Sequence, residues 1–245
     1  MRQLPLCGLV LVATIPCFSS FSYAEDTLSF SFSPPPITRP GEQVNKLGFN
    51  FTSLEYETTD VDGNITTTDF SLFGMNMLTK NNGGFFAGSL VSGSDEQDIT
   101  RVTGLNFNGG GELKSESGFA MSVGLGFNLI YVVVDMTDSA NYFYSETTMT
   151  TMQLDFALQQ RIALGDSAGI TPYISMAYVM MGSGTTDTTV VVLGNSYTSS
   201  TEVEVDPYVS TQIGLDIDFA GMSLAAMVQE SDNTSITSLN FGFEF

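Results

Sequence analysis

Long stretches of this chain alternate, residue by residue, between apolar side chains and small or polar ones. The clearest stretch runs from Phe119 to Val133, where every second residue is apolar and most of those between are Gly, Ala, Ser or Asn. In a strand, alternate residues share a face, whereas in a helix these apolar residues would be scattered around the whole circumference. Because the pattern recurs over most of the sequence after residue 43, it predicts an all-β chain.

The alternation and the Gly, Pro, Asn and Asp breakers divide the chain into ten candidate strands, although eight or twelve would also fit. Longer connections are expected at 58–64, 136–146 and 183–199. The pattern changes phase between Phe51 and Leu54, which predicts a β-bulge. The candidate strands are 44–57, 65–78, 84–92, 99–108, 118–135, 147–164, 170–182, 200–219, 222–230 and 236–245.

Charge and residue content exclude several classes of function. The 245-residue chain has 27 acidic and 7 basic residues, a net charge of −20, which is unsuited to binding nucleic acid through a basic patch. It has no His, so it holds no Ser-His or Cys-His catalytic pair and no imidazole metal ligand. Paired acids such as Asp216 and Asp218 have no nucleophile or base beside them. We therefore expect no enzymatic activity, no catalytic residue and no bound cofactor.

The first 43 residues differ from the rest. Residues 1–24 combine Arg2, an apolar run and small residues before Ala24, which is typical of a cleaved signal peptide. The apolar run is too short to cross a membrane as a helix. Residues 25–43 hold four of the eight prolines, so they are predicted to form a Pro-rich tail or plug. The folded domain would then be residues 44–245.

Two architectures share long alternating strands. A soluble β-sandwich buries its apolar face, whereas a transmembrane barrel turns that face toward lipid. Three features favour the barrel: the polar faces carry almost no Lys, short and long connections alternate, and the last strand ends in alternating aromatics. The sequence thus predicts an antiparallel up-and-down transmembrane β-barrel. A secreted soluble β-sandwich binding protein is the alternative.

The export signal, the strand lengths and the ending Phe241-Gly242-Phe243-Glu244-Phe245 resemble those of Gram-negative outer-membrane β-barrel proteins, of the small OmpA-like or porin-like kind. The resemblance covers residues 44–245. It implies a location in the cell outer membrane, contact with outer-membrane lipid and lipopolysaccharide, and a periplasmic position for residues 25–43. It also implies that Phe241, Phe243 and Phe245 form an assembly signal read by the barrel-assembly machinery.

Two functional classes fit such a barrel. One is a structural or surface-interaction protein with a sealed or very narrow interior, and the other is a small cation-preferring porin that passes small solutes. Gly124, Gly126 and Gly214 would leave room inside, but small barrels are often filled by side chains, so we favour the sealed case. The residues expected to line the lumen are Gln153, Asp155, Gln159, Arg161, Gln212, Asp216 and Asp218.

Most acidic residues fall in or beside the predicted outer connections, whereas Lys46, Lys80 and Lys114 map to the opposite end. Asp95, Glu96 and Asp98 place three carboxylates within four residues. Carboxylate oxygens suit hard cations, so this cluster is the candidate for a weak Ca²⁺ or Mg²⁺ site. A solvated acidic loop is the alternative.

Overall fold

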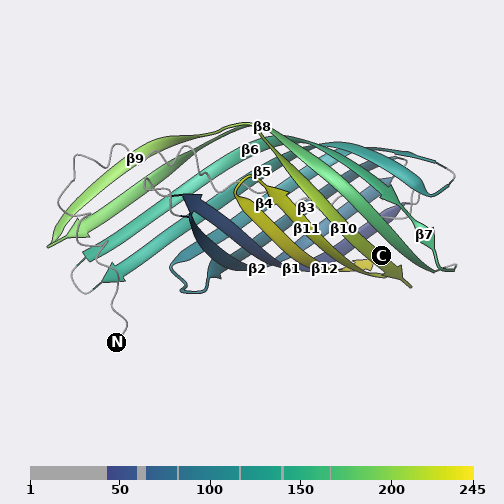
Figure 1. Ribbon diagram of the computed structural model, residues 1–245, viewed down its shortest axis with the longest axis horizontal. Coiled ribbons are helices and arrows are strands. Elements are labelled where there is room, and N and C mark those ends of the chain that lie inside the picture. The colour runs from purple at the N-terminus through teal and green to yellow at the C-terminus, as the bar shows by residue number, and fades with distance from the viewer. Residues whose placement is uncertain (1–42, 60–64, 82, 116, 139–140, 166) are drawn as a thin grey trace.

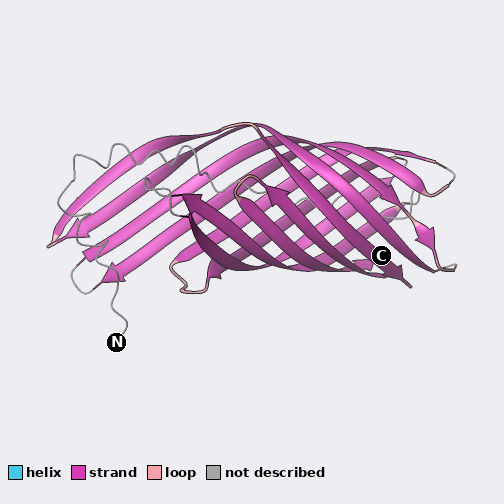
Figure 2. Cartoon of the chain, viewed as in Figure 1, coloured by secondary structure: helices cyan, strands magenta, loops and turns pink. Residues whose placement is uncertain are grey.

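The computed structural model describes residues 43–59, 65–81, 83–115, 117–138, 141–165 and 167–245. The predicted signal peptide and residues 25–42 of the predicted tail lie outside the described residues. The described chain is all-β (Figure 2), and it contains no helix long and apolar enough to span a membrane. The strands are β1 (Val44–Thr59), β2 (Ile65–Asn81), β3 (Gly84–Asp95), β4 (Thr100–Lys114), β5 (Phe119–Asp138), β6 (Asn141–Gln160), β7 (Ile162–Ala163), β8 (Ala168–Val192), β9 (Asn195–Val205), β10 (Tyr208–Phe219), β11 (Met222–Ser231) and β12 (Thr234–Glu244).

Ten of these strands close into an antiparallel barrel (Figure 1). Consecutive strands pair from β1 to β6, β6 pairs with β8, and β8 pairs with β10, followed by β11 and β12. β1 pairs with β12 from Lys46↔Glu244 to Tyr56↔Thr234, so the wall is continuous. The short β7 and the strand β9 each pair with β8. The predicted ten-strand barrel is confirmed, and the sandwich alternative is wrong because all described strands belong to one closed sheet.

The two faces of the wall differ as the alternation predicts. On β5, Leu125 and Phe127 are exposed on the outside of the barrel, whereas Ser122 and Asn128 are buried inside it. The same alternation of exposed and buried residues follows the other barrel strands. We call the end where β1 begins and β12 ends the inner end, and the opposite end the outer end.

The bulge predicted in β1 is absent from the structure. β1 pairs with β12 and with β2 in an unbroken register through Phe51 and Leu54. Phe51 lies on the outside and Leu54 lies inside, fully buried, so the alternation never shifts. The sequence pattern changes because the inner face of β1 turns from polar to apolar after Thr52. The register shifts instead between β6 and β8, at Met152 and Gln153.

Two of the long outer connections predicted from the sequence are mostly strand. β5 and β6 extend into 136–146, and β8 and β9 extend into 183–199. These segments are rich in Thr, Val and Tyr, which favour strands. The turn between β8 and β9 is Leu193-Gly194, with both φ angles positive, as a tight hairpin requires. The third connection, 58–64, lies largely outside the described residues.

The lengthened strands project beyond the rest of the barrel as an open four-stranded sheet, seen at the left of Figure 1. We call this sheet the outer extension. Its strands lie in the order β5–β6–β8–β9. β6 pairs with β5 on one side and with β8 on the other, and β9 pairs with β8. It consists of residues 131–138, 141–150, 182–192 and 195–205, and at its base residues 131–134 still pair with β4.

The strand predicted at 200–219 is in fact two strands, β9 and β10, separated at Asp206 and Pro207. Pro207 has no N–H to donate to a ladder, and the faces of the strand change over at this break. Val205 of β9 and Ser210 of β10 are both buried, although they are five residues apart. Glu202 and Glu204 therefore lie on the outward face, whereas one unbroken strand over 200–219 would have placed them on the inward face with Asp216 and Asp218.

Candidate functional site in the barrel interior

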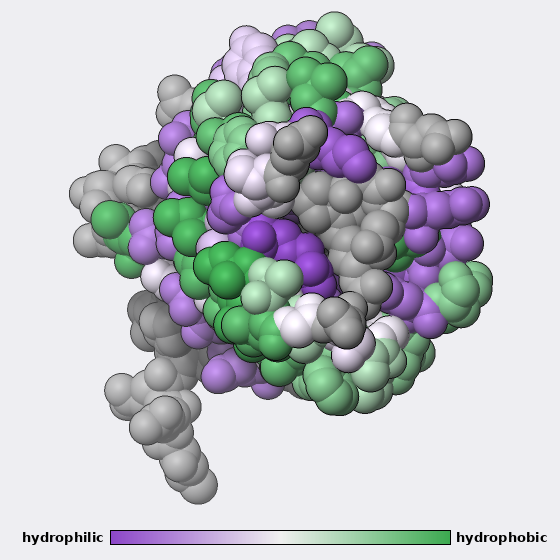
Figure 3. All heavy atoms as spheres, turned by 90° about the vertical axis from the view of Figure 1, so that its right-hand side faces the viewer, coloured by the Kyte–Doolittle hydropathy of each residue, from purple (hydrophilic) through white to green (hydrophobic). Residues whose placement is uncertain are grey.

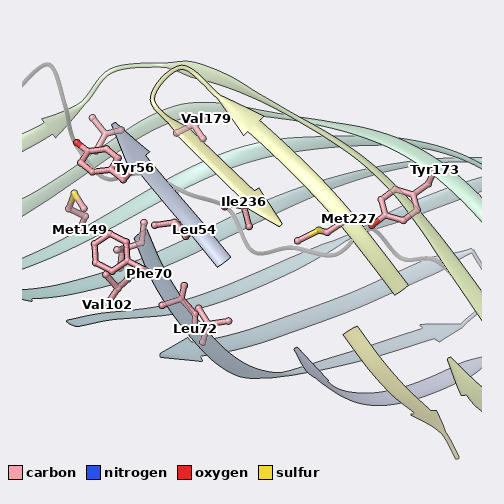
Figure 4. Packing of buried hydrophobic residues seen from close by; sticks show 13 residues of the cluster. Leu54, Tyr56, Phe70, Leu72, Val102, Met149, Tyr173, Val179, Met227 and Ile236 are labelled. Carbon is pink, nitrogen blue, oxygen red and sulfur yellow. The ribbon is translucent and has the colours of Figure 1, made fainter. Parts of the chain in front are cut away.

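Toward the outer end, the interior of the barrel is apolar. Buried hydrophobic side chains from every described strand except β7 and β10 form one cluster, and Tyr208 of β10 packs against it. Figure 4 shows these side chains projecting from facing walls into the space between them. We call this cluster the apolar layer. Its members are Leu54, Tyr56, Phe70, Leu72, Val91, Val102, Ile130, Met149, Tyr173, Val179, Val205, Met227 and Ile236. Of these, Tyr173 and Met227 lie farthest toward the inner end, at the level of Gly214.

Glycines in the wall make room for the apolar layer. A Cβ atom added at Gly74 would lie 2.6 Å from Cγ1 of Val91, and one added at Gly184 would lie 2.9 Å from Cγ of Met149. Atoms cannot approach so closely without displacement. Backbone oxygens of Leu90 and Thr148 and the Asn50 side chain lie closer still. The space left by each missing side chain is therefore occupied by neighbouring backbone and side-chain atoms, which is the close packing expected of a filled interior.

The glycines expected to leave room in the lumen are also occupied. A Cβ at Gly126 would lie 2.7 Å from Cγ of Gln153, and one at Gly214 would lie 2.3 Å from the Tyr173 ring. A Cβ at Gly124 would meet the Asn108 side chain at 2.4 Å. At these three positions the inward space is filled by neighbouring side chains.

Toward the inner end, the interior is polar and charged. Figure 3 looks onto this end and shows strongly hydrophilic residues toward its middle, with hydrophobic residues around much of its rim. Lys80 is only 1% exposed, and its Nζ lies 2.5 Å from Oε2 of Glu112. Gln159 donates a second hydrogen bond to the same oxygen, at 3.1 Å. Burying an ion pair costs desolvation free energy, which close pairing and added hydrogen bonds offset.

Two more ion pairs near the inner end join residues that come from different parts of the barrel wall. The Arg161 guanidinium donates to both oxygens of Asp218, with Nε–Oδ1 at 3.4 Å and NH2–Oδ2 at 2.8 Å. This two-point pairing fixes geometry as well as charge. Nζ of Lys46, on β1, lies 3.4 Å from Oδ2 of Asp216 on β10. The inward-facing acids Asp216 and Asp218 are thus each held by a cation.

Amide side chains form a directed series of hydrogen bonds that ends at Asp155. Asn106 donates to Asn128 at 2.6 Å, Asn128 donates to Gln153 at 2.7 Å, and Gln153 donates to Oδ1 of Asp155 at 2.7 Å. Asn108 donates to Oδ2 of Asp155. Both carboxylate oxygens of Asp155 therefore accept from amides, and its described partners carry no positive charge.

All seven residues predicted to line the lumen face the inside of the barrel. Their side chains contact one another or other inward-facing groups, so they form part of a packed polar interior. Gln153, Gln159, Gln212, Asp216 and Asp218 are buried, and Asp155 and Arg161 are partly buried.

Sequence reasoning missed the most deeply buried charges. Lys80 and Glu112 were assigned no inward role, although Lys80 stands an even number of residues from the buried Phe70 and Leu72 on β2. That even spacing could have indicated that Lys80 points inward. No sequence pattern could have indicated its pairing with Glu112, because the pairing depends on the relative placement of separate strands in the closed wall.

The acidic turn between β3 and β4 does not bring its carboxylates together. Oδ1 of Asp95 accepts the backbone N–H groups of Ile99 and Thr100, at 2.8 and 3.2 Å. Asp98 pairs with Arg101 at 3.3 Å, and the hydrogen bond from Arg101 lowers the pKa of Asp98. Glu96 is exposed, and no group of three acids among the described residues is arranged to hold a metal ion. A weak cation site here stays a prediction, and it would need Asp98 to leave Arg101.

The last strand, β12, pairs with the first strand, β1, and its aromatic side chains lie on the outside of the barrel. Phe241 and Phe243 are exposed there, and the Phe241 ring lies 6.5 Å from the Phe51 ring of β1. Phe245 is 84% exposed, and its backbone N–H donates to the carbonyl of Asn45 at 3.0 Å. Recognition of these aromatics by an assembly machinery stays a prediction.

A closed wall with an apolar exterior and a polar, charged interior is the arrangement of a transmembrane β-barrel. Large exposed apolar surfaces on proteins mark contact with a partner or with lipid. Here exposed Phe, Leu, Ile, Met and Val side chains occur on the outside of every barrel strand. This geometry defines the class of the protein as an integral membrane β-barrel.

The solved structures that are similar to this chain share little sequence with it. No protein-family model and no curated protein matches the chain. Among solved structures, the chain is similar to the translocator domain of the autotransporter NalP from Neisseria meningitidis, with 10% identity, a TM-score of 0.49, and coverage of 83% of this chain and 88% of that one. It is also similar to the outer-membrane protease OmpT from Escherichia coli, with 9% identity, a TM-score of 0.49 and coverage of 87% and 100%.

The β domain of the Bordetella autotransporter BrkA gives 10% identity, a TM-score of 0.47 and coverage of 83% of this chain and 99% of that one. The closed ten-strand antiparallel barrel of this chain is itself the fold that the resemblance to outer-membrane β-barrel proteins implies. These proteins differ in function, so the role of the present chain has to be argued from its own residues.

Proposed function

We propose that this protein is a structural or surface-interaction protein of the cell outer membrane, with a barrel interior that is sealed or very narrow. The apolar layer carries the proposal, because it extends around the inside of the barrel near its outer end. Ions and water cross apolar constrictions poorly. The three ion pairs nearer the inner end, with Lys46, Lys80 and Arg161 as cations, add a second packed zone.

The outer extension supports the surface-interaction part of the proposal. Its strands continue beyond the apolar exterior of the barrel, and on their outward face they carry Glu146, Asp187, Glu202 and Glu204 in place of apolar residues. Short connections at the inner end and long hairpins at the outer end match barrels whose larger structures face outside the cell. The extension is therefore the part that a partner outside the cell would meet.

Solute flux through reconstituted vesicles tests the sealed interior. Vesicles that contain the folded protein should swell no faster in an arabinose solution than vesicles without protein, and they should retain trapped K⁺. A variant that shortens three members of the apolar layer, Leu54→Ala with Phe70→Ala and Ile236→Ala, should release K⁺. Rapid swelling with the unaltered protein would refute the proposal.

A narrow cation-preferring pore is the second candidate, and Asp155 is the observation that favours it. Its carboxylate is held by Asn108 and Gln153 and has no cation among its described partners. A cation passing along the interior would find its complementary charge there. In the vesicle experiment this alternative predicts K⁺ release without arabinose entry, and Asp155→Asn would reduce the release.

A further inference from the structure

We propose that the free edge of β9 is a docking site for an extended Lys- or Arg-rich polypeptide segment, which adds to the outer extension as one more strand. The inference rests on the proposed surface-interaction role and names the kind of partner. It is carried by two independent features, an unpaired strand edge and a one-signed charge distribution.

The edge of β9 has no strand beside it in the described chain. All eleven residues of β9 pair with β8, from Val192↔Asn195 to Gly182↔Val205, and β9 pairs with no other described strand. β10, which continues the wall, pairs with β11 only from Thr211↔Glu230 inward. Among the described residues, the backbone N–H and C=O groups on the other side of β9 therefore have no strand to pair with, and such an edge is a template for strand addition.

The edge lacks most of the features that usually block strand addition. Natural edge strands are protected by Pro, Lys, bulges or very short length. β9 is 11 residues long, has neither Pro nor Lys, and pairs with β8 without a register shift. Residues 195–202 are exposed and mostly Ser and Thr, so a neighbouring strand would meet mainly small side chains, with Tyr197 as the bulky exception. The free edge is thus open to an incoming backbone.

The charge of the outer extension selects a basic partner. The extension has no Lys or Arg, whereas Glu146, Asp187, Glu202 and Glu204 share its outward face. Glu146 and Asp187 stand directly opposite each other on β6 and β8, and like charges in this position destabilise a sheet. Glu202 and Glu204 belong to the edge strand itself. A strand with Lys or Arg at alternate positions would place its cations beside these carboxylates.

A second copy of the chain is the less favourable occupant. Two copies in one membrane would bring two outer extensions together that both carry acidic residues, and neither would offer a Lys or Arg to Glu202 and Glu204. Like charges opposite each other are destabilising. Phosphate groups of lipid are repelled for the same reason. The geometry therefore favours a cationic polypeptide over either of these.

Binding of a synthetic peptide to the folded protein in detergent micelles tests the proposal. The probe is a ten-residue peptide of alternating Lys and Thr, followed by fluorescence anisotropy. One control peptide has Glu in place of Lys, and another keeps Lys but carries N-methyl groups on alternate backbone nitrogens. We expect the Lys–Thr peptide to bind, the Glu–Thr peptide not to bind, and the methylated peptide to bind at least about tenfold more weakly because it loses ladder hydrogen bonds.

Protein variants locate the site. Glu202→Gln with Glu204→Gln should weaken binding of the Lys–Thr peptide about fivefold, as expected for two exposed ion pairs. The matched control is Glu55→Gln with Glu57→Gln, which removes the same charge at the same spacing from β1, a strand paired on both sides there. The control should bind the peptide as the unaltered protein does. Amide hydrogen exchange should show new protection in β9 when the peptide is bound.

Three results would overturn the proposal. Equal binding of the methylated and unmethylated peptides would mean that the acidic surface merely adsorbs cations, and equal loss in the two double variants would mean that β9 is not the site. Dimer formation without peptide that slows exchange in β9 would assign the edge to a second copy. None of these results bears on vesicle flux, so failure of this proposal and failure of the sealed interior are distinguishable.

Discussion

Single inward-facing residues of this barrel pair with specific residues on other strands, and Lys80 is the clearest example. It is almost completely buried on β2 and meets Glu112 of β4, which Gln159 of β6 also contacts. Removing one partner of a buried ion pair leaves an uncompensated charge. The pair therefore fixes the relative placement of three strands.

Replacement of Lys80 tests this role. Lys80→Met should lower the free energy of unfolding by about 3–5 kcal/mol, because it leaves the Glu112 carboxylate buried without a cation. The measurement is urea unfolding in detergent micelles. Lys114→Met is the control, since Lys114 is exposed at the same end of the barrel, and it should change stability little. Equal effects of the two substitutions would contradict the importance of the pair.

Tyr144 reports on the surface of the outer extension. Its hydroxyl donates to Oε2 of Glu146 at 3.0 Å, and this bond raises the pKa of Tyr144 from 10.0 to about 12. Since the folded pKa lies above the unfolded one, the bond contributes stability below pH 10 that is lost as the pH rises through about 12. Spectrophotometric titration should show late tyrosine ionisation, and comparison with variants assigns the contribution of Tyr144. Glu146→Gln should return its pKa toward 10, whereas Asp135→Asn, on the facing strand, should not.

At the scale of strands, glycine residues allow neighbouring strands and their side chains to approach closely. A Cβ at Gly93 of β3 would lie 1.9 Å from the carbonyl oxygen of Ser71 and 2.9 Å from Cδ2 of Leu72. The first of these atoms belongs to the backbone of β2, so the strands would have to move apart. Gly111, on β4, has its nearest such neighbour at 3.6 Å.

Alanine substitution at these two glycines separates the effect of side-chain crowding from the effect of replacing glycine in a strand. Gly93→Ala should destabilise the folded barrel by about 1–3 kcal/mol, the usual cost of forcing extra atoms into a packed site. Gly111→Ala should be close to neutral. Thermal unfolding followed by circular dichroism gives both values. A neutral Gly93→Ala would show that the space opposite Leu72 is not filled.

The strands themselves follow from the sequence to a large extent. The alternation in 118–135 and 222–230 predicts β5 and β11 to within a few residues, because lipid on one side and a packed interior on the other enforce a period of two. The outer ends of β6 and β8 were predicted as loops. Their Thr, Ser and acidic residues lack an apolar alternation, since no lipid faces them above the barrel.

The interior was only partly predictable. The residues that point inward follow from the phase of each strand, and Asp216 and Gln212, which were predicted to line the lumen, are both buried. Their partners depend on which strands face each other and at what height, as with Lys46 and Asp216 at a separation of 170 residues. Leu54 led to the wrong prediction of a β-bulge in β1. It is an apolar residue that points into the barrel, and in the sequence such a residue looks like one that faces lipid.

At the scale of the whole molecule, the exterior must match the hydrocarbon of a bilayer. Leu125 lies midway between Phe119 and Tyr131 on the outside of β5 and is 58% exposed. Leu125→Arg should cost about 2–4 kcal/mol if that level is the bilayer midplane. Leu193→Arg, in the exposed turn at the tip of the extension, should cost nearly nothing. Refolding equilibria in lipid vesicles measure both, and a small loss at Leu125 would place that face in water.

Single-channel recording in planar bilayers tests the sealed interior most directly. The unaltered protein should give no stable unitary current steps. Leu54→Ala with Phe70→Ala and Ile236→Ala shortens three adjacent members of the apolar layer and should give steps, whereas the matched exterior triple, Phe51→Ala with Phe73→Ala and Leu239→Ala, should not. Steady unitary conductance of the unaltered protein would contradict the sealed barrel and establish a pore.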